Sequence, residues 1–190
     1  MRTAALAALG AVALFGAGEA SVRLRDVDGN LRSPLSVMGQ AAVLFFIATD
    51  CPISNFFASE IQGICKDYGT RGVACSLLYE DVQVDTNGVR KHMADFQYRN
   101  FTAFIDADRK ISTRMNAAVT PSAVVLDKAG KVRYRGRINN FYVDLGKPRR
   151  QATVQDLRDA LDAVLAGKPV AVPETRPVGC YIVSPDVLKN

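Results

Sequence analysis

Cys51 is the residue of this chain whose position most favours chemistry. It follows, after three residues, the uniformly apolar run 41–47, whose length and composition predict a strand buried on both faces. Residues 55–68 then change to a helical period, which places Cys51 at or just before a helix N-terminus. Unpaired N–H groups and the positive end of the helix dipole lower the pKa of a thiol there, and the thiolate is the nucleophilic form. We therefore expect the Cys51 sulfur to be ionised and accessible.

The other three cysteines differ in whether they can reach Cys51. Cys65 lies about 20 Å further along the same predicted helix, whereas a disulfide spans about 6 Å between Cα atoms. Cys75 lies inside a second apolar run, 72–79, and is predicted to be a buried core thiol. Cys180 ends a proline-rich stretch that can extend about 40 Å, against a radius of gyration of about 15 Å for a domain of this size. Only Cys180 is therefore free to reach Cys51.

Three hypotheses remain open for Cys180. It resolves or caps Cys51 in a redox cycle, it forms a structural disulfide that fixes the tail, or it is a free thiol in a tail without fixed structure. The apolar neighbours Val178, Tyr181 and Ile182 indicate that this piece docks on the domain. Four cysteines permit three complete pairings, which the sequence does not rank.

Composition predicts a globular chain and excludes some functions. With 190 residues, 48% of them hydrophobic and 23% charged, the chain is long enough to bury one sizeable core. A net charge of +5 without a dense Lys/Arg tract is not that of a nucleic-acid binder, and the basic residues at 147–150 are expected in a solvated loop. His92 is the only histidine, so we expect it to be packed or at the surface rather than a metal ligand.

The first 20 residues have the pattern of a secretory signal peptide. Arg2 precedes an apolar stretch over 4–16, and the small residues around Ala20 suit a signal peptidase. The apolar part is shorter than the roughly 20 residues that cross a bilayer, so no stable membrane span is expected after cleavage. We expect a secreted or periplasmic protein, in which cysteines form lasting disulfides.

The rest of the chain alternates predicted strands and helices, as is typical of an α/β fold. The expected elements are a hairpin over 22–31, strands over 72–79, 101–106, 119–127 and 132–138, helices over 86–98 and 154–165, and a helical turn over 111–116. We expect a polar loop over 139–152 and a solvated face formed by Arg133, Arg135 and Arg137. Residues 167–190 contain four prolines and are expected to be an extended tail rather than a packed element.

This order of elements, with Cys51-Pro52-Ile53-Ser54 after the central strand and Thr120-Pro121 opening a later one, resembles the thioredoxin-like fold. It is most similar to the redoxin branch, the alkyl hydroperoxide reductase and thiol-specific antioxidant group, over a domain of residues 21–166. The resemblance implies a central mixed β-sheet flanked by helices. It also implies a cis proline at Pro121 that faces the reactive cysteine, and a backbone edge at Thr120 and Pro121 that pairs with a substrate chain.

The sequence departs from the family patterns at several positions. Thioredoxins carry a second cysteine where this chain has Ser54, so the motif by itself cannot resolve a mixed disulfide. Peroxiredoxins place a threonine or serine at the position of Ala48 and a proline at the position of Leu44, while Thr49 is one residue away. The arginine of those peroxidases is also missing after Pro121. These differences favour disulfide exchange over peroxide reduction.

We therefore predict an exported thiol–disulfide oxidoreductase. Cys51 is the attacking thiolate, with Thr49, Pro52 and Ser54 as its supporting motif, and Cys180 is the candidate resolving thiol. Its partners are protein or small-molecule thiols and disulfides, and the reaction requires no cofactor or metal. The alternatives are a non-catalytic binding module that holds a protein partner or copper, and a thiol peroxidase of the peroxiredoxin type.

Overall fold

A computed structural model describes residues 22–183 of the chain. The predicted signal peptide, residues 1–20, with its cleavage site near Ala20, lies outside the described residues. Within residues 22–183, none of the helices combines the length and the hydropathy that crossing a bilayer requires.

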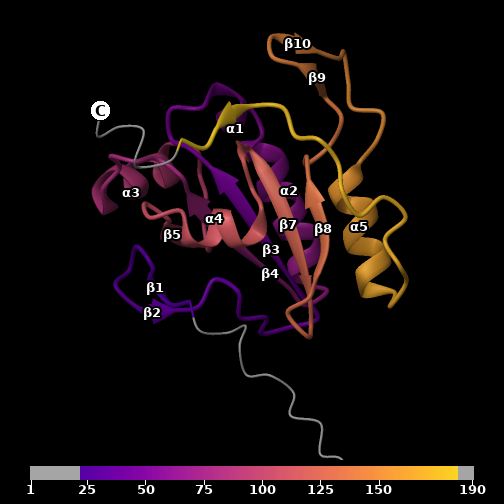
Figure 1. The fold of residues 1–190 in the computed structure, drawn as a ribbon, viewed down its shortest axis with the longest axis horizontal. Coiled ribbons are helices and arrows are strands. Elements are labelled where there is room, and N and C mark those ends of the chain that lie inside the picture. The colour runs from indigo at the N-terminus through magenta and orange to yellow at the C-terminus, as the bar shows by residue number, and fades with distance from the viewer. Residues whose placement is uncertain (1–21, 184–190) are drawn as a thin grey trace, which may run out of the picture.

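The core of the fold is a mixed sheet of five strands, in the order β5-β4-β3-β7-β8 (Figure 1). Its strands are β3 (Ala41–Ile47), β4 (Val73–Tyr79), β5 (Thr102–Ile105), β7 (Ser122–Asp127) and β8 (Val132–Gly136). The first three are parallel to one another, and β7 and β8 run antiparallel to their neighbours. Every residue of β3 is buried, which confirms the predicted central strand.

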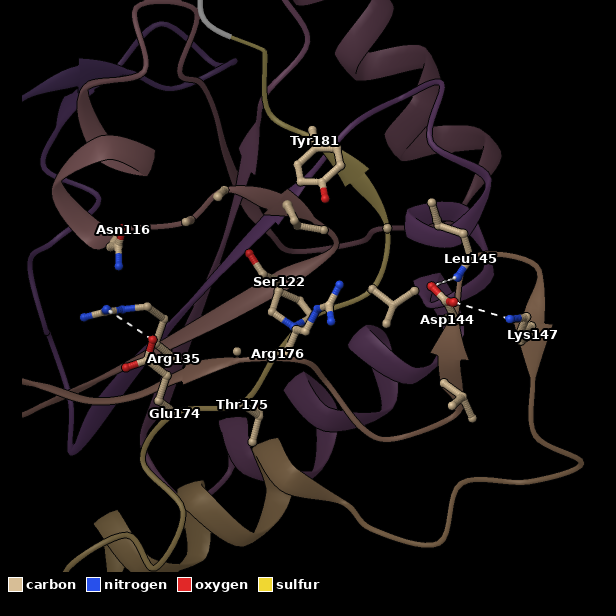
Figure 2. Close-up of a pocket in the computed structure, with 18 residues that line it drawn as sticks. Asn116, Ser122, Arg135, Asp144, Leu145, Lys147, Glu174, Thr175, Arg176 and Tyr181 are labelled. Atoms are coloured by element: carbon tan, nitrogen blue, oxygen red, sulfur yellow. Dashed lines mark hydrogen bonds and ion pairs between the residues drawn. The ribbon is translucent and has the colours of Figure 1, made fainter.

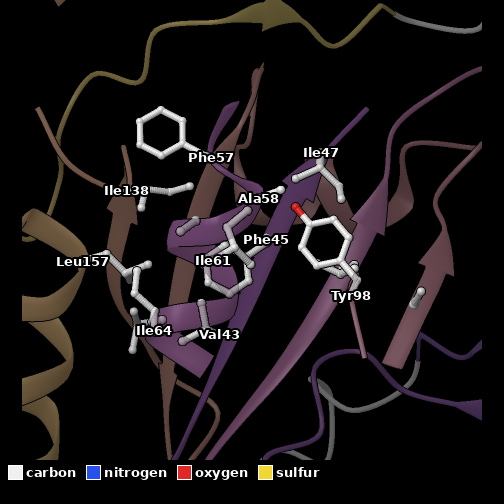
Figure 3. Close-up of a cluster of buried hydrophobic side chains, with 14 of the residues drawn as sticks. Val43, Phe45, Ile47, Phe57, Ala58, Ile61, Ile64, Tyr98, Ile138 and Leu157 are labelled. Carbon is white, nitrogen blue, oxygen red and sulfur yellow. The ribbon is translucent and has the colours of Figure 1, made fainter. Parts of the chain in front are cut away.

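Side chains that alternate along β3 enter two separate clusters because a strand directs neighbours to opposite faces. On one face, Val43, Phe45 and Ile47 pack with side chains of the helices α2 (Ala58–Gly69) and α5 (Asp156–Leu165) (Figure 3). On the other, Leu44 and Phe46 pack with side chains of the helix α4 (Lys110–Met115). The sheet is thereby covered on both faces, which is why β3 tolerates no polar residue.

The helices are α1 (Pro52–Phe56), α2 (Ala58–Gly69), α3 (Thr86–Asp95), α4 (Lys110–Met115) and α5 (Asp156–Leu165). The single helix predicted over 55–68 is wrong in detail, because the chain bends at Phe57 between α1 and α2. The short α1 carries the segment after Cys51, and α2 supplies the buried apolar face. The break lets the first turn point at the end of the sheet while α2 packs along it.

Smaller elements account for the remaining predictions. The expected hairpin is confirmed as β1 (Leu24–Arg25) with β2 (Leu31–Arg32). The expected polar loop over 139–152 is wrong, because it contains a second hairpin of β9 (Tyr142–Asp144) and β10 (Lys147–Pro148) that projects from the body in Figure 1. We call residues 139–152 the arm. The pattern escaped prediction because both strands are short and largely exposed.

Arg133 and Arg135 of β8, and Arg137 just after it, do not form a purely solvated face. Arg133 pairs with Asp127 at 2.6 Å and Arg137 with Asp156 at 2.8 Å, whereas Arg135 lies 3.9 Å from Glu174. These partners come from β7, α5 and the C-terminal segment, so the arginines tie neighbouring elements to the sheet.

The docking expected from the apolar residues around Cys180 is confirmed, whereas the expectation that the tail forms no packed element is wrong for its described part. Residues 173–183, which we call the strap, run from α5 across one end of the sheet, as the yellow trace of Figure 1 shows. The strap first bonds to β8, through Arg135 N–H to the Pro173 carbonyl at 2.9 Å and Thr175 N–H to the Arg135 carbonyl at 3.0 Å. It then forms β11 (Cys180–Tyr181), which pairs with β6 (Val119–Thr120). Prolines prevent a helix but allow this extended pairing.

Cys75 is not a core thiol, because it forms a disulfide with Cys65, with 6.1 Å between their Cα atoms. Cys65 lies in the last part of α2 and Cys75 near the start of β4, and only a short turn separates the two elements. The apolar run over 72–79 concealed this pairing, since its first half is only partly buried. The bridge fixes the end of α2 against the sheet.

Removing this disulfide lowers stability without touching Cys51. For a loop of this size, loss of the cross-link is expected to lower the free energy of unfolding by roughly 2 to 3 kcal/mol. Urea unfolding of the oxidised wild-type chain and of the Cys65→Ser/Cys75→Ser double variant measures the difference. Equal unfolding free energies would show that the bridge contributes nothing.

Candidate functional site

Cys51 occupies the junction that the sequence predicts, between the end of β3 and the first turn of α1. It is the N-cap residue of α1, with φ −83° and ψ 109°, and Pro52 is the first helical residue. Proline fits this position because the first N–H groups of a helix have no intrahelical partner. The Cys51 carbonyl accepts a hydrogen bond from the Asn55 amide at 3.0 Å, which closes the first turn of α1. The Cys51 sulfur lies beside this first turn, whose leading amides have no partner within the helix.

The strap brings Cys180 directly onto Cys51. Strand β11 pairs antiparallel with β6 so that Cys180 lies opposite Thr120 and Tyr181 opposite Val119. The two sulfur atoms are 2.7 Å apart, with the Cys180 thiol as donor and both cysteines free. When Cys51 is itself protonated, it donates to the Thr120 carbonyl at 3.4 Å. Residues 129 positions apart in the sequence thus form one dithiol site.

The pKa values of the two thiols are shifted in opposite directions. Burial opposes ionisation of Cys51, but hydrogen bonds from the Cys180 thiol and from the Ser54 hydroxyl and amide outweigh it and hold the pKa of the Cys51 thiol below its ordinary value. The Ser54 hydroxyl is buried and has no hydrogen-bond partner of good geometry, so its effect on the Cys51 sulfur comes from its proximity. Burial raises the pKa of Cys180 to about 12, and its hydrogen bond to Cys51 and the nearby charge of Asp50 act in the same direction. When the two thiols share one proton, the charge therefore resides on Cys51 and the proton on Cys180.

The expectation of an accessible Cys51 sulfur is wrong for this arrangement. Cys51 is 0% exposed, because the strap lies over it, whereas Cys180 is only partly buried. Cys51 is covered in part by the Cys180 thiol, which lies close enough to form a bond to it, and not only by apolar side chains. The Cys51 sulfur is therefore covered, but both thiols that a disulfide requires are in contact.

The peptide bond between Thr120 and Pro121 is cis, as the family resemblance implies. The backbone edge beside it is the one expected to pair with a substrate chain. Here β11 of the same chain pairs with that edge. The strap therefore lies in the position that the sequence analysis assigns to a substrate.

Close packing and two further contacts hold the strap in register. A Cβ on Gly179 would overlap the Thr120 carbonyl oxygen, so only glycine allows this approach. Beyond the strand, the Ile182 amide donates to the Ala118 carbonyl at 3.0 Å. Arg109 Nε donates to the Val183 carbonyl at 3.0 Å while its Nη1 contacts Glu80 at 3.0 Å.

The other end of the strap is held by Thr175. Its hydroxyl lies 2.7 Å from the Tyr134 hydroxyl and accepts the Arg137 amide at 3.0 Å. Gly136, with φ +150°, makes room for Thr175, since a Cβ there would overlap it. The strap is therefore held at Thr175 and again at Cys180, with only four residues between the two points.

Sequence reasoning missed two groups that hold the loop around Cys51. The Asp81 carboxylate accepts the Thr49 amide at 2.9 Å and the Thr49 hydroxyl at 2.6 Å, which directs this threonine away from a peroxidase role. Asn55 donates to the Thr49 carbonyl at 3.0 Å, and its other amide atom lies 2.8 Å from His92 Nε2. The signal for Asp81 was its place at the end of β4, because carboxyl ends of neighbouring parallel strands meet at one edge.

His92 is packed, as predicted, and both of its ring nitrogens are engaged. Nδ1 lies 2.9 Å from the Tyr79 hydroxyl, while Nε2 faces Asn55. Burial lowers the pKa of His92 below its ordinary value, so the ring is neutral at physiological pH. Within residues 22–183, no group of three His, Cys, Asp or Glu side chains is placed to hold a metal ion.

Two cavities flank the strap. One, of about 640 Å³, is lined by Cys180 together with Thr49, Asp50 and Asp81. The other, of about 450 Å³, lies between the strap and the arm, and Figure 2 shows Arg176, Ser122 and Tyr181 around it. Tyr181 lines both cavities and is 75% exposed. Cys180 is thus the sulfur that borders open space.

The fold and the dithiol site together define a thioredoxin-like redoxin. The model of the AhpC/TSA family matches residues 18–135, which is more than half of the chain. The chain belongs to the AhpC/TSA family, as the resemblance implies. It matches none of the curated proteins.

Solved structures show the same architecture. An uncharacterized conserved protein from Geobacillus kaustophilus is 25% identical, with a TM-score of 0.75, over 93% of this chain and 99% of its own. A hypothetical protein from Sinorhizobium meliloti is 26% identical, with a TM-score of 0.72, over 85% and 89%. A secreted Mycobacterium tuberculosis disulfide oxidoreductase, homologous to Escherichia coli DsbE, is 21% identical, with a TM-score of 0.54, over 77% and 95%, and shows the fold alone.

The first of these likenesses extends beyond the predicted domain. Because 93% of 190 residues is more than the 166 residues that precede the tail, the match with the Geobacillus protein includes part of residues 167–190. The tail therefore belongs in part to the architecture that the two proteins share.

Replacing Gly179 by alanine is expected to release the strap. The added Cβ meets the Thr120 carbonyl, and overlap of this kind in a packed site typically costs about 1 to 3 kcal/mol. This cost destabilises the docked strap relative to the undocked strap. Alkylation of Cys51 by a bulky maleimide in the reduced Gly179→Ala variant should accelerate about tenfold or more. The control is Gly69→Ala, where a Cβ meets nothing within 4 Å. Equal protection of Cys51 in both variants would show that the strap does not gate it.

Proposed function

We propose that this protein is a thiol–disulfide oxidoreductase whose redox couple is Cys51 and Cys180. The single observation that carries the proposal is the 2.7 Å approach of the two sulfurs at a helix N-terminus. A thiolate beside a protonated thiol is the reduced form of such a couple, and the same geometry allows the bond to form. The cis Thr120-Pro121 edge and membership of the AhpC/TSA family support the same reading.

The proposed exchange balances in atoms and electrons. In the oxidised protein, Cys51 and Cys180 share a disulfide. Two outside thiols, RSH, give up two protons and two electrons, form RSSR, and leave Cys51 and Cys180 as free thiols. The reverse reaction reduces an outside disulfide. No metal or organic cofactor takes part in either direction.

A C-x-x-C motif supplies both the attacking and the resolving cysteine, whereas here Cys51-Pro52-Ile53-Ser54 supplies the first sulfur and the strap supplies the second. Ser54, at the position of the missing cysteine, supports the Cys51 thiolate, whereas Cys180 supplies the second sulfur from the strap. Val119 and Thr120, next to Pro121, form the edge on which the cysteine-bearing strand docks. The proposed partners are protein or small-molecule thiols and disulfides.

Peptide mapping of the full chain tests the couple. After mild oxidation, mass spectrometry of the unreduced digest should find Cys51 linked to Cys180, and dithiothreitol should open this link under native conditions. The protein should reduce insulin, and Cys51→Ser should lower that rate by about 100-fold or more, since Cys180 is then left without the sulfur with which it forms the disulfide. The Cys65→Ser/Cys75→Ser variant is the matched control and should keep its activity.

Other results would replace the proposal. A link that resists dithiothreitol in the folded protein would make it a structural bridge. Absence of the link, with no insulin reduction, would favour a binding module. Fast oxidation of Cys51 by hydrogen peroxide, resolved by Cys180, would favour a thiol peroxidase.

We also propose that the protein is exported. Support comes from the pattern of the first 20 residues and from the Cys65–Cys75 disulfide, since such bonds persist in oxidising compartments. When residues 1–190 are expressed in a Gram-negative host, the mature protein should begin at or near Ser21 and appear in the periplasmic fraction. A matched chain without residues 2–20 should stay in the cytoplasm. An intact N-terminus in the cytoplasmic fraction for the full chain would contradict export.

A further inference from the structure

We propose that Cys180, rather than Cys51, is the sulfur that exchanges with outside thiols, and that its acidic surroundings favour thiols carrying a positive charge. The inference rests on the proposed function, because it takes the Cys51–Cys180 disulfide as the oxidised state. It differs from the pattern expected from the sequence, in which Cys51 meets the substrate and Cys180 only resolves it.

Access to the two sulfurs is the first argument. Cys51 is 0% exposed and lies between α1, Thr120 and the strap. Cys180 is partly exposed and borders the cavity of about 640 Å³. An incoming thiol therefore reaches Cys180 with the strap docked, whereas it reaches Cys51 only after β11 has left β6. The anchors at Gly179, Val183 and Thr175 oppose that departure.

The chemistry of the leaving group is the second argument. A thiolate that attacks Cys180 bonds to its sulfur, breaks the Cys51–Cys180 bond and expels Cys51 as a thiolate. Burial opposes ionisation of Cys51, but the Ser54 hydroxyl and amide stabilise its thiolate whether or not Cys180 carries a proton, and a thiol with a stabilised thiolate leaves faster. Attack on Cys51 would expel Cys180, whose pKa is raised by burial. The buried sulfur is thus the better leaving group.

The cycle then closes at the surface. A second outside thiolate attacks the substrate sulfur of the mixed disulfide, forms RSSR and expels Cys180 as a thiolate, which takes up a proton. Cys51 never bonds to the substrate. It stores the negative charge under the strap, while Cys180 makes and breaks every bond with outside molecules.

Charge around the cavity gives the substrate class. Its ionisable wall residues, besides Cys180 and Tyr181, are Asp50, Glu80, Asp81 and Arg109. Glu80 and Arg109 form a buried pair at 3.0 Å, and burial raises the pKa of Glu80 to about 8, so Arg109 is the one cation against the carboxylates of Asp50 and Asp81. Asp50 is exposed and Asp81 half-buried, which leaves the mouth with an excess of negative charge. A cationic thiol is attracted there, and an anionic one is repelled.

The cavity on the other side of the strap supplies a control. It carries Arg135, Lys147 and Arg176, and in Figure 2 the labelled Arg176 lies on the strap below Tyr181. Neutralising Arg176 changes charge near the strap without touching the cavity that Cys180 borders.

The first experiment locates the attacked sulfur. The oxidised full chain is mixed with cysteamine, quenched in acid at successive times, denatured, treated with N-ethylmaleimide and mapped by mass spectrometry. At the earliest times, cysteamine should be on Cys180 and the maleimide on Cys51. Cysteamine on Cys51 with the maleimide on Cys180 would overturn the proposal. If no Cys51–Cys180 disulfide is present before mixing, the proposed function itself fails, so the two failures are distinguishable.

The second experiment measures charge selection with three two-carbon thiols: cysteamine, neutral 2-mercaptoethanol and anionic 2-mercaptoethanesulfonate. With rates corrected for each thiolate fraction, cysteamine should exceed the sulfonate by about fivefold or more at low salt, and added salt should reduce the ratio. Asp50→Asn should lower this ratio, while Arg176→Gln should leave it unchanged. A ratio that is independent of salt and of Asp50 would overturn the charge selection.

Discussion

The pairing of residues 180–181 with residues 119–120 is the interaction on which the rest of the site depends. It places the Cys180 thiol 2.7 Å from Cys51, it closes the sheet edge beside the cis Thr120-Pro121 bond, and it removes Cys51 from solvent. Backbone bonds in a short antiparallel pair fix the register of a side chain to within one residue. The acidities of both thiols follow from that register, since each sulfur is the main polar neighbour of the other.

The four cysteines divide into two pairs with separate tasks. Cys65 and Cys75 join α2 to β4 in a bridge between elements that are already neighbours in the chain. Cys51 at the start of α1 meets Cys180 in a segment that follows the whole domain in the sequence. The first pair is bonded and links two elements of the scaffold, and the second is the pair that we propose as the redox couple. A local cross-link and a distant, unbonded dithiol fit these different roles.

Support for the thiolate comes from residues that the strand order brings to one edge of the sheet. Asp81 at the end of β4 holds Thr49 through two hydrogen bonds, and His92 on α3 holds Asn55 on α1. Neither contact reaches the sulfur directly. They fix the loop before Cys51 and the turn after it, so the amides of α1 keep a constant direction relative to the strap.

The sequence alone determined the scaffold and the first sulfur. The apolar run 41–47 and the change of period after Cys51 have a local physical meaning, and the central strand and the helix start follow from them. The family and the cis proline at 121 came from the resemblance to redoxins. The tertiary structure alone decided which cysteines meet. Cys75 looked like a core residue because strand periodicity does not tell how deeply each end of a strand is buried. The apolar residues around Cys180 predicted that the strap docks but not where it docks, because its prolines exclude a helix and its stabilising bonds are all with residues far away in the sequence. Pairing of an extended segment depends on the edge that accepts it, and that edge exists only once the sheet has formed.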